Sequence, residues 1–211
     1  MDRAEKDGRR EARLEAFELA FRRQMAAPGV FDLEDETKAT RELYGVDGKH
    51  TDEFGRQCLL ARRLAEAGVR FIQVNHSYPR NYWDAHGGLR ANHSKNSMKI
   101  DQPIAALIKD LKMRGLLDEN LIRRGAEFGR TPMFQGTKLA GAGRDHHKEA
   151  YSIWMAGGGI RGGVSVGKTD ELGSAAVESP FHVRNLHATI LHQWGLHPNR
   201  PSYLFHGLVE K

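Results

Sequence analysis

The chain has 211 residues, 39% of them hydrophobic, and 32 lysines and arginines stand against 27 aspartates and glutamates. This composition predicts a globular domain, or part of a larger one, with an ordinary core. The net charge of +5 comes from scattered arginine pairs rather than basic runs, so nucleic-acid binding is not expected. The single cysteine, Cys58, excludes an internal disulfide, and no apolar stretch approaches the ~20 residues of a membrane span.

The chain is expected to open with a helix. Apolar residues recur at spacings of three and four over residues 3–25, so we treat 1–27 as an N-terminal helix and 28–211 as the main domain. Its second residue is already charged, which excludes a signal peptide at this end and leaves localisation unknown. A second helix is predicted from an N-cap at Asp32 to a stop at Gly45.

The remaining sequence alternates helical and strand patterns, which is the unit of an α/β sheet. A helix over 52–67 leads through Gly68 into a strand over 69–75. The other predicted elements are a helix over 99–114, strands over 120–125 and 150–159, and a closing helix over 183–196. We therefore expect a three-layer α/β/α fold with a mixed, mainly parallel sheet.

The strand expected at 120–125 contains two adjacent arginines, Arg123 and Arg124. Both cannot face an apolar layer without partners. Either this strand lies at a sheet edge, or another part of the protein covers it.

Three polar clusters adjoin the predicted strands. Asp84 and His86 follow the strand at 69–75, in a loop that also holds His76 and His93; Glu127 and Arg130 follow the strand at 120–125; and Asp145, His146 and His147 precede the strand at 150–159. Loops that follow parallel strands meet at one sheet edge, so the first two clusters can meet. The third reaches that edge only if its strand runs antiparallel.

Carboxylates and neutral imidazoles are suitable ligands for a divalent ion: zinc, or a harder ion if carboxylates dominate. Arg130 would then bind a phosphate or sulfate group. The alternative is that these side chains only cap turns, pair with each other or face solvent. His187 and His192, on the closing helix, are expected at a surface or interface. Gly157–Gly159 does not match the dinucleotide-binding pattern, which requires spaced glycines opening a helix.

Several stretches together resemble the DUF1501 family over about residues 28–207: "FGRQCLLARRLAEAGVRFIQV", "YWDAHG", "DQPIAALIKDLKMRGLLDENL", "EFGRTP", "GRDHHKEAYSIWMAGGGIRGG" and "HVRNLHATILHQWGL". The resemblance implies membership of the alkaline-phosphatase-like, or sulfatase-like, superfamily. It also implies a mainly parallel sheet with a metal centre at the strand ends, and hydrolysis of phosphate or sulfate esters.

The resemblance also implies roles for individual residues. Trp83, Asp84 and His86 match a family motif that makes Asp84 and His86 ligands. Glu127 matches a ligand acid, although Phe128 stands where a histidine is usual. His146 becomes the strongest ligand candidate, with Asp145 and His147 as supporting or alternative ligands. The metal is expected to be zinc, manganese or calcium.

Full-length family members are longer and carry a "GGPSH"-type loop ahead of these motifs, so the resemblance implies that this chain is the C-terminal half. The sequence then supports two functions. The first is a metal-dependent hydrolase of small-molecule or polysaccharide phosphate or sulfate esters. The second is a non-catalytic, degenerate binding or structural protein of the same fold. The sequence leaves the oligomeric state open.

Overall fold

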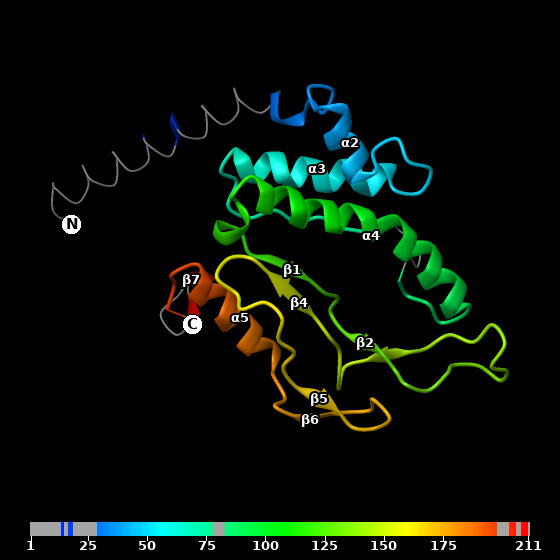
Figure 1. Cartoon of the computed structure of the whole chain (residues 1–211). Coiled ribbons are helices and arrows are strands. Elements are labelled where there is room, and N and C mark those ends of the chain that lie inside the picture. Colours follow the sequence, from blue (N-terminus) through cyan, green and yellow to red (C-terminus); the bar gives the residue numbers. More distant parts are fainter. Residues whose placement is uncertain are drawn as a thin grey trace. The chain divides into compact units, whose positions relative to one another are not determined.

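The computed structural model describes residues 14, 17–18, 29–77, 83–197, 203–205 and 208–210. The chain divides into two compact units, unit 1 (1–76 with 98–107) and unit 2 (77–97 with 108–211), whose elements are labelled in Figure 1. The helix expected over 3–25 lies almost entirely outside the described residues. None of the described helices has the length and apolar character needed to cross a membrane.

Unit 1 is built from helices α2 (Lys38–Tyr44) and α3 (Asp52–Glu66) and the middle of α4 (Leu89–Met113). The predicted third helix is confirmed within a residue. The predicted start of the second helix was wrong, because Thr37 caps α2 by accepting a hydrogen bond from the amide of Thr40. Asp32 instead accepts a hydrogen bond from the amide of Glu34 and so forms a local turn.

The core of unit 1 lies where these helices touch. Tyr44, Cys58, Leu59 and Pro103 are its largest fully buried side chains. Gly55 allows α3 to approach the end of α2 closely, since a Cβ atom there would lie 2.4 Å from the carbonyl oxygen of Tyr44. A side chain at this position would push the two helices apart.

Burial makes Cys58 an unreactive thiol. Its side chain is 1% exposed, and burial raises the pKa of the thiol to about 12. Because the thiolate is the reactive form, we expect Ellman's reagent to leave Cys58 unmodified in the native protein at pH 8 and to modify it completely in urea. Rapid labelling without denaturant would contradict this burial.

Helix α4 begins ten residues before the predicted start at 99. The prediction missed this first part because its residues are mostly polar and show no apolar periodicity. Its predicted end is correct within one residue. His93, expected in a loop, therefore lies on α4. The prediction of a strand over 69–75 was wrong: this segment forms neither a helix nor a strand, and it pairs with no strand among the described residues.

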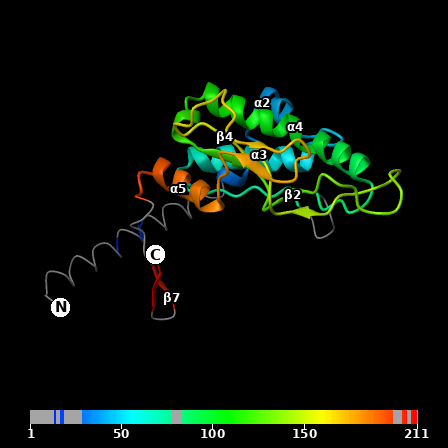
Figure 2. The same ribbon diagram turned by 90° about the horizontal axis from the view of Figure 1, so that it is seen from below.

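The strands of unit 2 form an irregular antiparallel ribbon. β1 (Ile122–Arg124) pairs with β4 (Trp154–Ala156), and β2 (Gly129–Arg130) pairs with β3 (His146–His147). Figures 1 and 2 show the segment that contains β1 and β2 running beside the segment that contains β3 and β4. The strand that follows Asp145, His146 and His147 is β4, and it runs antiparallel to β1. This is the orientation that the sequence analysis needed for these residues to meet Glu127 and Arg130.

The other elements of unit 2 are short. They are the 3₁₀ helix η1 (Leu117–Glu119), strands β5 (Lys168–Thr169) and β6 (Ala176–Glu178), helix α5 (Val183–Gln193), and strands β7 (Tyr203–Phe205) and β8 (Leu208–Glu210). Gly157–Gly159 all have positive φ and form a turn rather than opening a helix, in agreement with the rejection of a dinucleotide loop.

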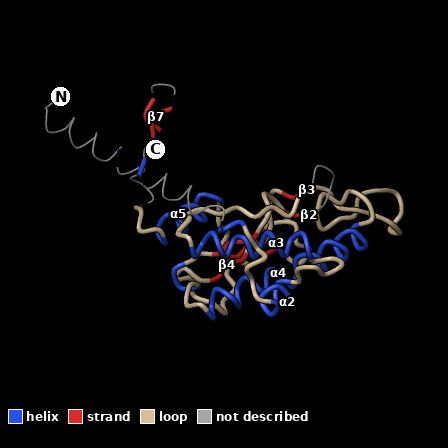
Figure 3. The backbone as a smooth tube through the Cα atoms, turned by 90° about the horizontal axis from the view of Figure 1, so that it is seen from above, coloured by secondary structure: helices blue, strands red, loops and turns tan. Residues whose placement is uncertain are grey.

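The chain thus combines helices and strands, and an α/β class in this broad sense is confirmed. A three-layer fold with a mainly parallel sheet is not seen, because every sheet among the described residues consists of two antiparallel strands. The strands are two or three residues long, and loops connect most of them, as Figure 3 shows. Arg123 and Arg124 are exposed, because each strand of a two-stranded pair is an edge strand.

Candidate metal site

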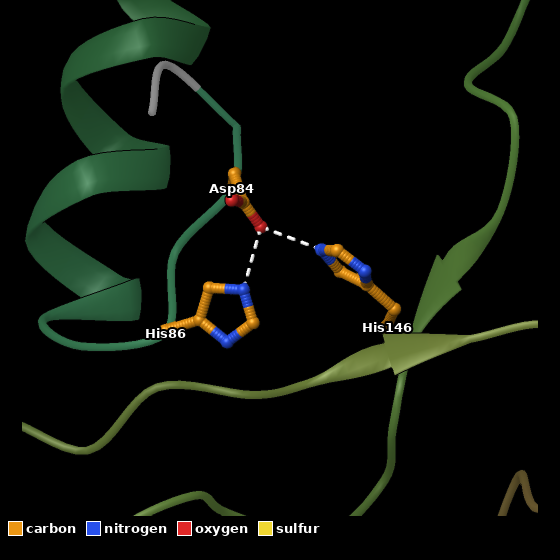
Figure 4. A group of neighbouring side chains, drawn as sticks. All are labelled: Asp84, His86 and His146. Atoms are coloured by element: carbon orange, nitrogen blue, oxygen red, sulfur yellow. Dashed lines mark hydrogen bonds and ion pairs between the residues drawn. The ribbon is translucent and has the colours of Figure 1, made fainter. Parts of the chain in front are cut away.

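Asp84 lies at the centre of a polar group in unit 2. Its Oδ1 atom is 2.9 Å from Nε2 of His86, 2.8 Å from Nε2 of His146 and 2.6 Å from Nη2 of Arg130 (Figure 4 shows the first two contacts). One ligand atom from each of Asp84, His86 and His146 can be chosen so that all lie within 4.8 Å of one another. These three side chains can therefore bind a single ion together.

Three segments hold this group, and the segment 141–147 lies between the other two. On one side, the amides of Gly88 and Arg144 donate to the carbonyls of Gly141 and Ala85, at 2.9 and 3.0 Å. On the other side, the amide of Thr131 donates to the carbonyl of Asp145 at 2.9 Å. The backbone therefore fixes the loop that carries His86 and the strand that carries Arg130 against His146.

Gly143 makes the close approach of these segments possible. A Cβ atom at this position would lie 2.0 Å from the carbonyl carbon of His86 and 2.3 Å from the amide nitrogen of Gly87. Those are backbone atoms, which cannot rotate away as a side chain does. Any residue larger than glycine would therefore displace the loop that carries Asp84 and His86.

The hydrogen-bond partners of His86 suit a metal ligand. Its Nδ1 atom lies 2.7 Å from Oε1 of Gln135, and its Nε2 atom lies 2.9 Å from Oδ1 of Asp84. Both oxygens can only accept hydrogen bonds, but a neutral imidazole has a single N–H. With Nδ1–H donating to Gln135, the lone pair of Nε2 faces a carboxylate oxygen. A metal ion between the two atoms would use this lone pair and the carboxylate oxygen together.

Asp84 is ionised at any physiological pH. The hydrogen bond from Arg130, followed by the one from His146, lowers the pKa of Asp84 to about 2. A carboxylate in this state is ready to bind a metal without first losing a proton. The Arg130 side chain is only 18% exposed, whereas those of Asp84 and His146 are 41% and 45% exposed, so the group is open to solvent on one side.

The ring of His146 is positioned by two neighbours. The ring of Phe128 lies against it at a tilt of 32°, with ring centroids 4.6 Å apart, and the carboxylate of Asp145 holds the backbone here by accepting a hydrogen bond from the His146 amide at 2.8 Å. Asp145 also lies 3.7 Å from Nδ1 of His86. Phe128, which stands where the family resemblance expects a histidine, thus supports the imidazole of His146.

The structure therefore brings Asp84, His86, His146 and Arg130 together and places Asp145 beside them. It does not bring in His147, whose side chain points to the other side of β3; this ring is buried and its Nε2 lies 3.1 Å from the carbonyl oxygen of Gly173. Glu127 is exposed and is not part of the ligand group found among the described residues.

Sequence reasoning missed Gln135 and Gly143. Gln135 is 49 residues from His86 in the chain, and no local pattern marks its side chain as a partner of an imidazole. Gly143 stands among several glycines, and only the packing of the segments distinguishes it. Both residues depend on tertiary contacts that a single sequence does not reveal.

Comparison with known proteins gives a family and nothing more specific. A family model described as "Protein of unknown function (DUF1501)" matches residues 1–211. No curated protein and no solved structure matches the chain. The chain belongs to the DUF1501 family.

Proposed function

We propose that this DUF1501 chain binds one divalent metal ion through Asp84, His86 and His146 and serves the hydrolysis of phosphate or sulfate esters. The observation that carries the proposal is the convergence of two imidazoles and one ionised carboxylate, with an arginine directly beside them. Three protein ligands leave a coordination position free, as in catalytic zinc sites. The sequence resemblance to the alkaline-phosphatase-like superfamily supports the same chemistry.

The ligand set favours zinc among the expected metals. Two of the three donors are imidazole nitrogens, whereas calcium takes six to eight oxygen ligands. Manganese, which also accepts imidazole, is the next candidate. When bound, such an ion would polarise an ester oxygen and lower the pKa of a bound water.

The chain's own residues would prepare the reaction. Gln135 would hold Nδ1–H of His86, which leaves Nε2 free as a ligand. Arg130 would face the anionic group of the ester, because its planar guanidinium matches the oxygens of phosphate and sulfate. The open side of the group would admit a small-molecule or polysaccharide ester.

The test is metal content, measured by mass spectrometry on the purified chain beside two variants. His146→Ala removes a ligand, and His187→Ala removes an exposed histidine of α5 as a matched control. We expect about one zinc per chain in the wild type and in His187→Ala, and at least a tenfold loss in His146→Ala. No metal in the wild type, even after loading, would refute the proposal. Stoichiometric metal would justify assays on phosphate and sulfate esters.

Gln135 gives a second prediction at this site. Replacement by leucine removes the acceptor for Nδ1 of His86, so we expect zinc affinity to fall by about 10- to 100-fold. Gln135→Glu keeps an acceptor oxygen and should retain most of the affinity. Titration of zinc against a competing chelator measures both variants. Equal affinities for Gln135→Leu and the wild type would show that the hydrogen bond does not orient His86.

The alternative function, a non-catalytic binding or structural protein, is favoured by one observation. The guanidinium of Arg130 already neutralises Asp84 at 2.6 Å, so the group can also act as an ion pair that ties the three segments together. That function predicts a folded wild-type chain without metal. The metal measurement therefore separates the two proposals.

A further inference from the structure

Arg130 and the two histidines all use the same oxygen of Asp84. Nη2 of Arg130, Nε2 of His86 and Nε2 of His146 each lie within 2.9 Å of Oδ1. An ion bound at both imidazole nitrogens would therefore meet Oδ1 at the point that the guanidinium now contacts. Two positive charges cannot share this oxygen without strong repulsion.

Arg130 has anchors that do not depend on Asp84. Nη2 also donates to the carbonyl oxygen of Trp83 at 3.1 Å, and Nη1 donates to the carbonyl oxygen of Arg144 at 3.2 Å. These carbonyls belong to the two segments that carry the candidate ligands. A guanidinium that loses Asp84 would therefore stay beside the site, with its positive charge no longer neutralised.

The guanidinium also has donors to offer. It carries five N–H bonds, and the contacts above use three of them. The Nε–H and one Nη1–H have no acceptor among the residues that the structure describes. Release of Asp84 would also free an Nη2–H, and an Nη2–H beside Nε–H forms the edge of the guanidinium that matches a pair of oxygens on a tetrahedral anion.

We propose that Arg130 couples metal binding to anion binding. While Arg130 holds Asp84, it opposes the cation. Once Asp84 binds the cation, Arg130 is released to bind a sulfate-like or phosphate-like group, whose negative charge removes the repulsion. Metal and anion then bind with positive cooperativity. This inference rests on the proposed metal site and adds to it the way in which the site is regulated.

Linkage makes the inference measurable. An anion that raises the affinity for the metal must itself bind more tightly, by the same factor, when the metal is present. We use zinc as the metal and inorganic sulfate as the anion, with chloride at equal ionic strength as the reference. In the wild type, sulfate should tighten zinc binding about tenfold, which is within the usual range for two coupled sites. Calorimetry should return the same factor when sulfate is titrated with and without zinc.

Two variants locate the effect. In Arg130→Gln, zinc should bind about tenfold more tightly than to the wild type in chloride, and sulfate should no longer change its affinity. Arg144→Gln removes the same charge from the neighbouring segment, where Arg144 contributes only backbone atoms to the site. This control should behave as the wild type. Circular dichroism establishes that each variant is folded.

The outcomes separate the inference from the metal site itself. If zinc binds the wild type and sulfate leaves its affinity unchanged, the coupling is refuted while the metal site stands; this result needs no variant. If Arg130→Gln and Arg144→Gln respond equally, Arg130 does not carry the coupling. If zinc binds none of the proteins, the proposed function and the coupling fail together.

Discussion

Replacement of Gly143 by alanine is expected to abolish most metal binding without removing any ligand. The added Cβ would lie 2.0 Å from the carbonyl carbon and 2.2 Å from the carbonyl oxygen of His86. Because both contacts are with backbone, the loop must move by roughly 1 Å, and a displacement of this size at a site can cost about 100-fold in function. We therefore expect zinc affinity to fall by about 100-fold in Gly143→Ala.

The matched control is Gly162→Ala. Nothing lies within 4 Å of a Cβ atom at this position, and its φ is not in the left-handed region. This variant should keep the zinc affinity and the melting temperature of the wild type. If Gly143→Ala also binds zinc normally, the two segments are not as closely packed as the structure shows.

The sequence was most informative where one segment determines its own structure. Helix α3 was predicted almost to the residue, because an apolar stripe and Gly68 define it locally. The polar clusters around Asp84 and His146 were also visible, because in each of them ligand-type side chains lie close together in the sequence. These features depend on neighbours in the chain rather than on distant contacts.

Features that depend on pairing were harder to predict. The segment 69–75 has the β-branched composition of a strand, but composition does not say whether a partner lies alongside. Successive side chains of a strand point to opposite sides, so His147 points away from His146 and the site. The sequence alone did not show that these two histidines lie on a strand. Gln135 became part of the site only because its segment lies beside residues 141–147.

The second large effect is expected in unit 1, at Glu36. Its side chain is 8% exposed, and its Oε1 atom lies 2.7 Å from Nη2 of Arg62 and 2.6 Å from Nη1 of Arg63. The side chain of Arg62 is only 3% exposed. Loss of Glu36 would leave two neighbouring guanidinium groups, one of them buried, with less negative charge to balance them. Removing one partner of a buried ion pair typically costs about 3–5 kcal/mol.

We therefore expect Glu36→Ala to lower the free energy of unfolding by about 3 kcal/mol, the lower end of that range because Glu66 still pairs with Arg62. Urea unfolding followed by circular dichroism measures the change. Glu42→Ala is the matched control: its partner Lys38 is 3.7 Å away and both side chains are exposed, so it should cost less than about 1 kcal/mol. Equal urea midpoints for the two variants would show that the buried pair does not stabilise unit 1.

The same residue predicts how the difference depends on pH. Burial raises the pKa of Glu36, but the hydrogen bonds from Arg63 and Arg62 outweigh burial, so the pKa in the folded chain is below its ordinary value of 4.5. A carboxyl group whose pKa is lowered by folding contributes its full stability above the unfolded-state pKa and loses it as the pH falls towards the folded-state pKa. The wild type should therefore exceed Glu36→Ala in stability at pH 7, and the two should converge as the pH falls below 4.5. A difference that stays constant from pH 7 to pH 3 would mean that Glu36 stabilises the unit by packing rather than by charge.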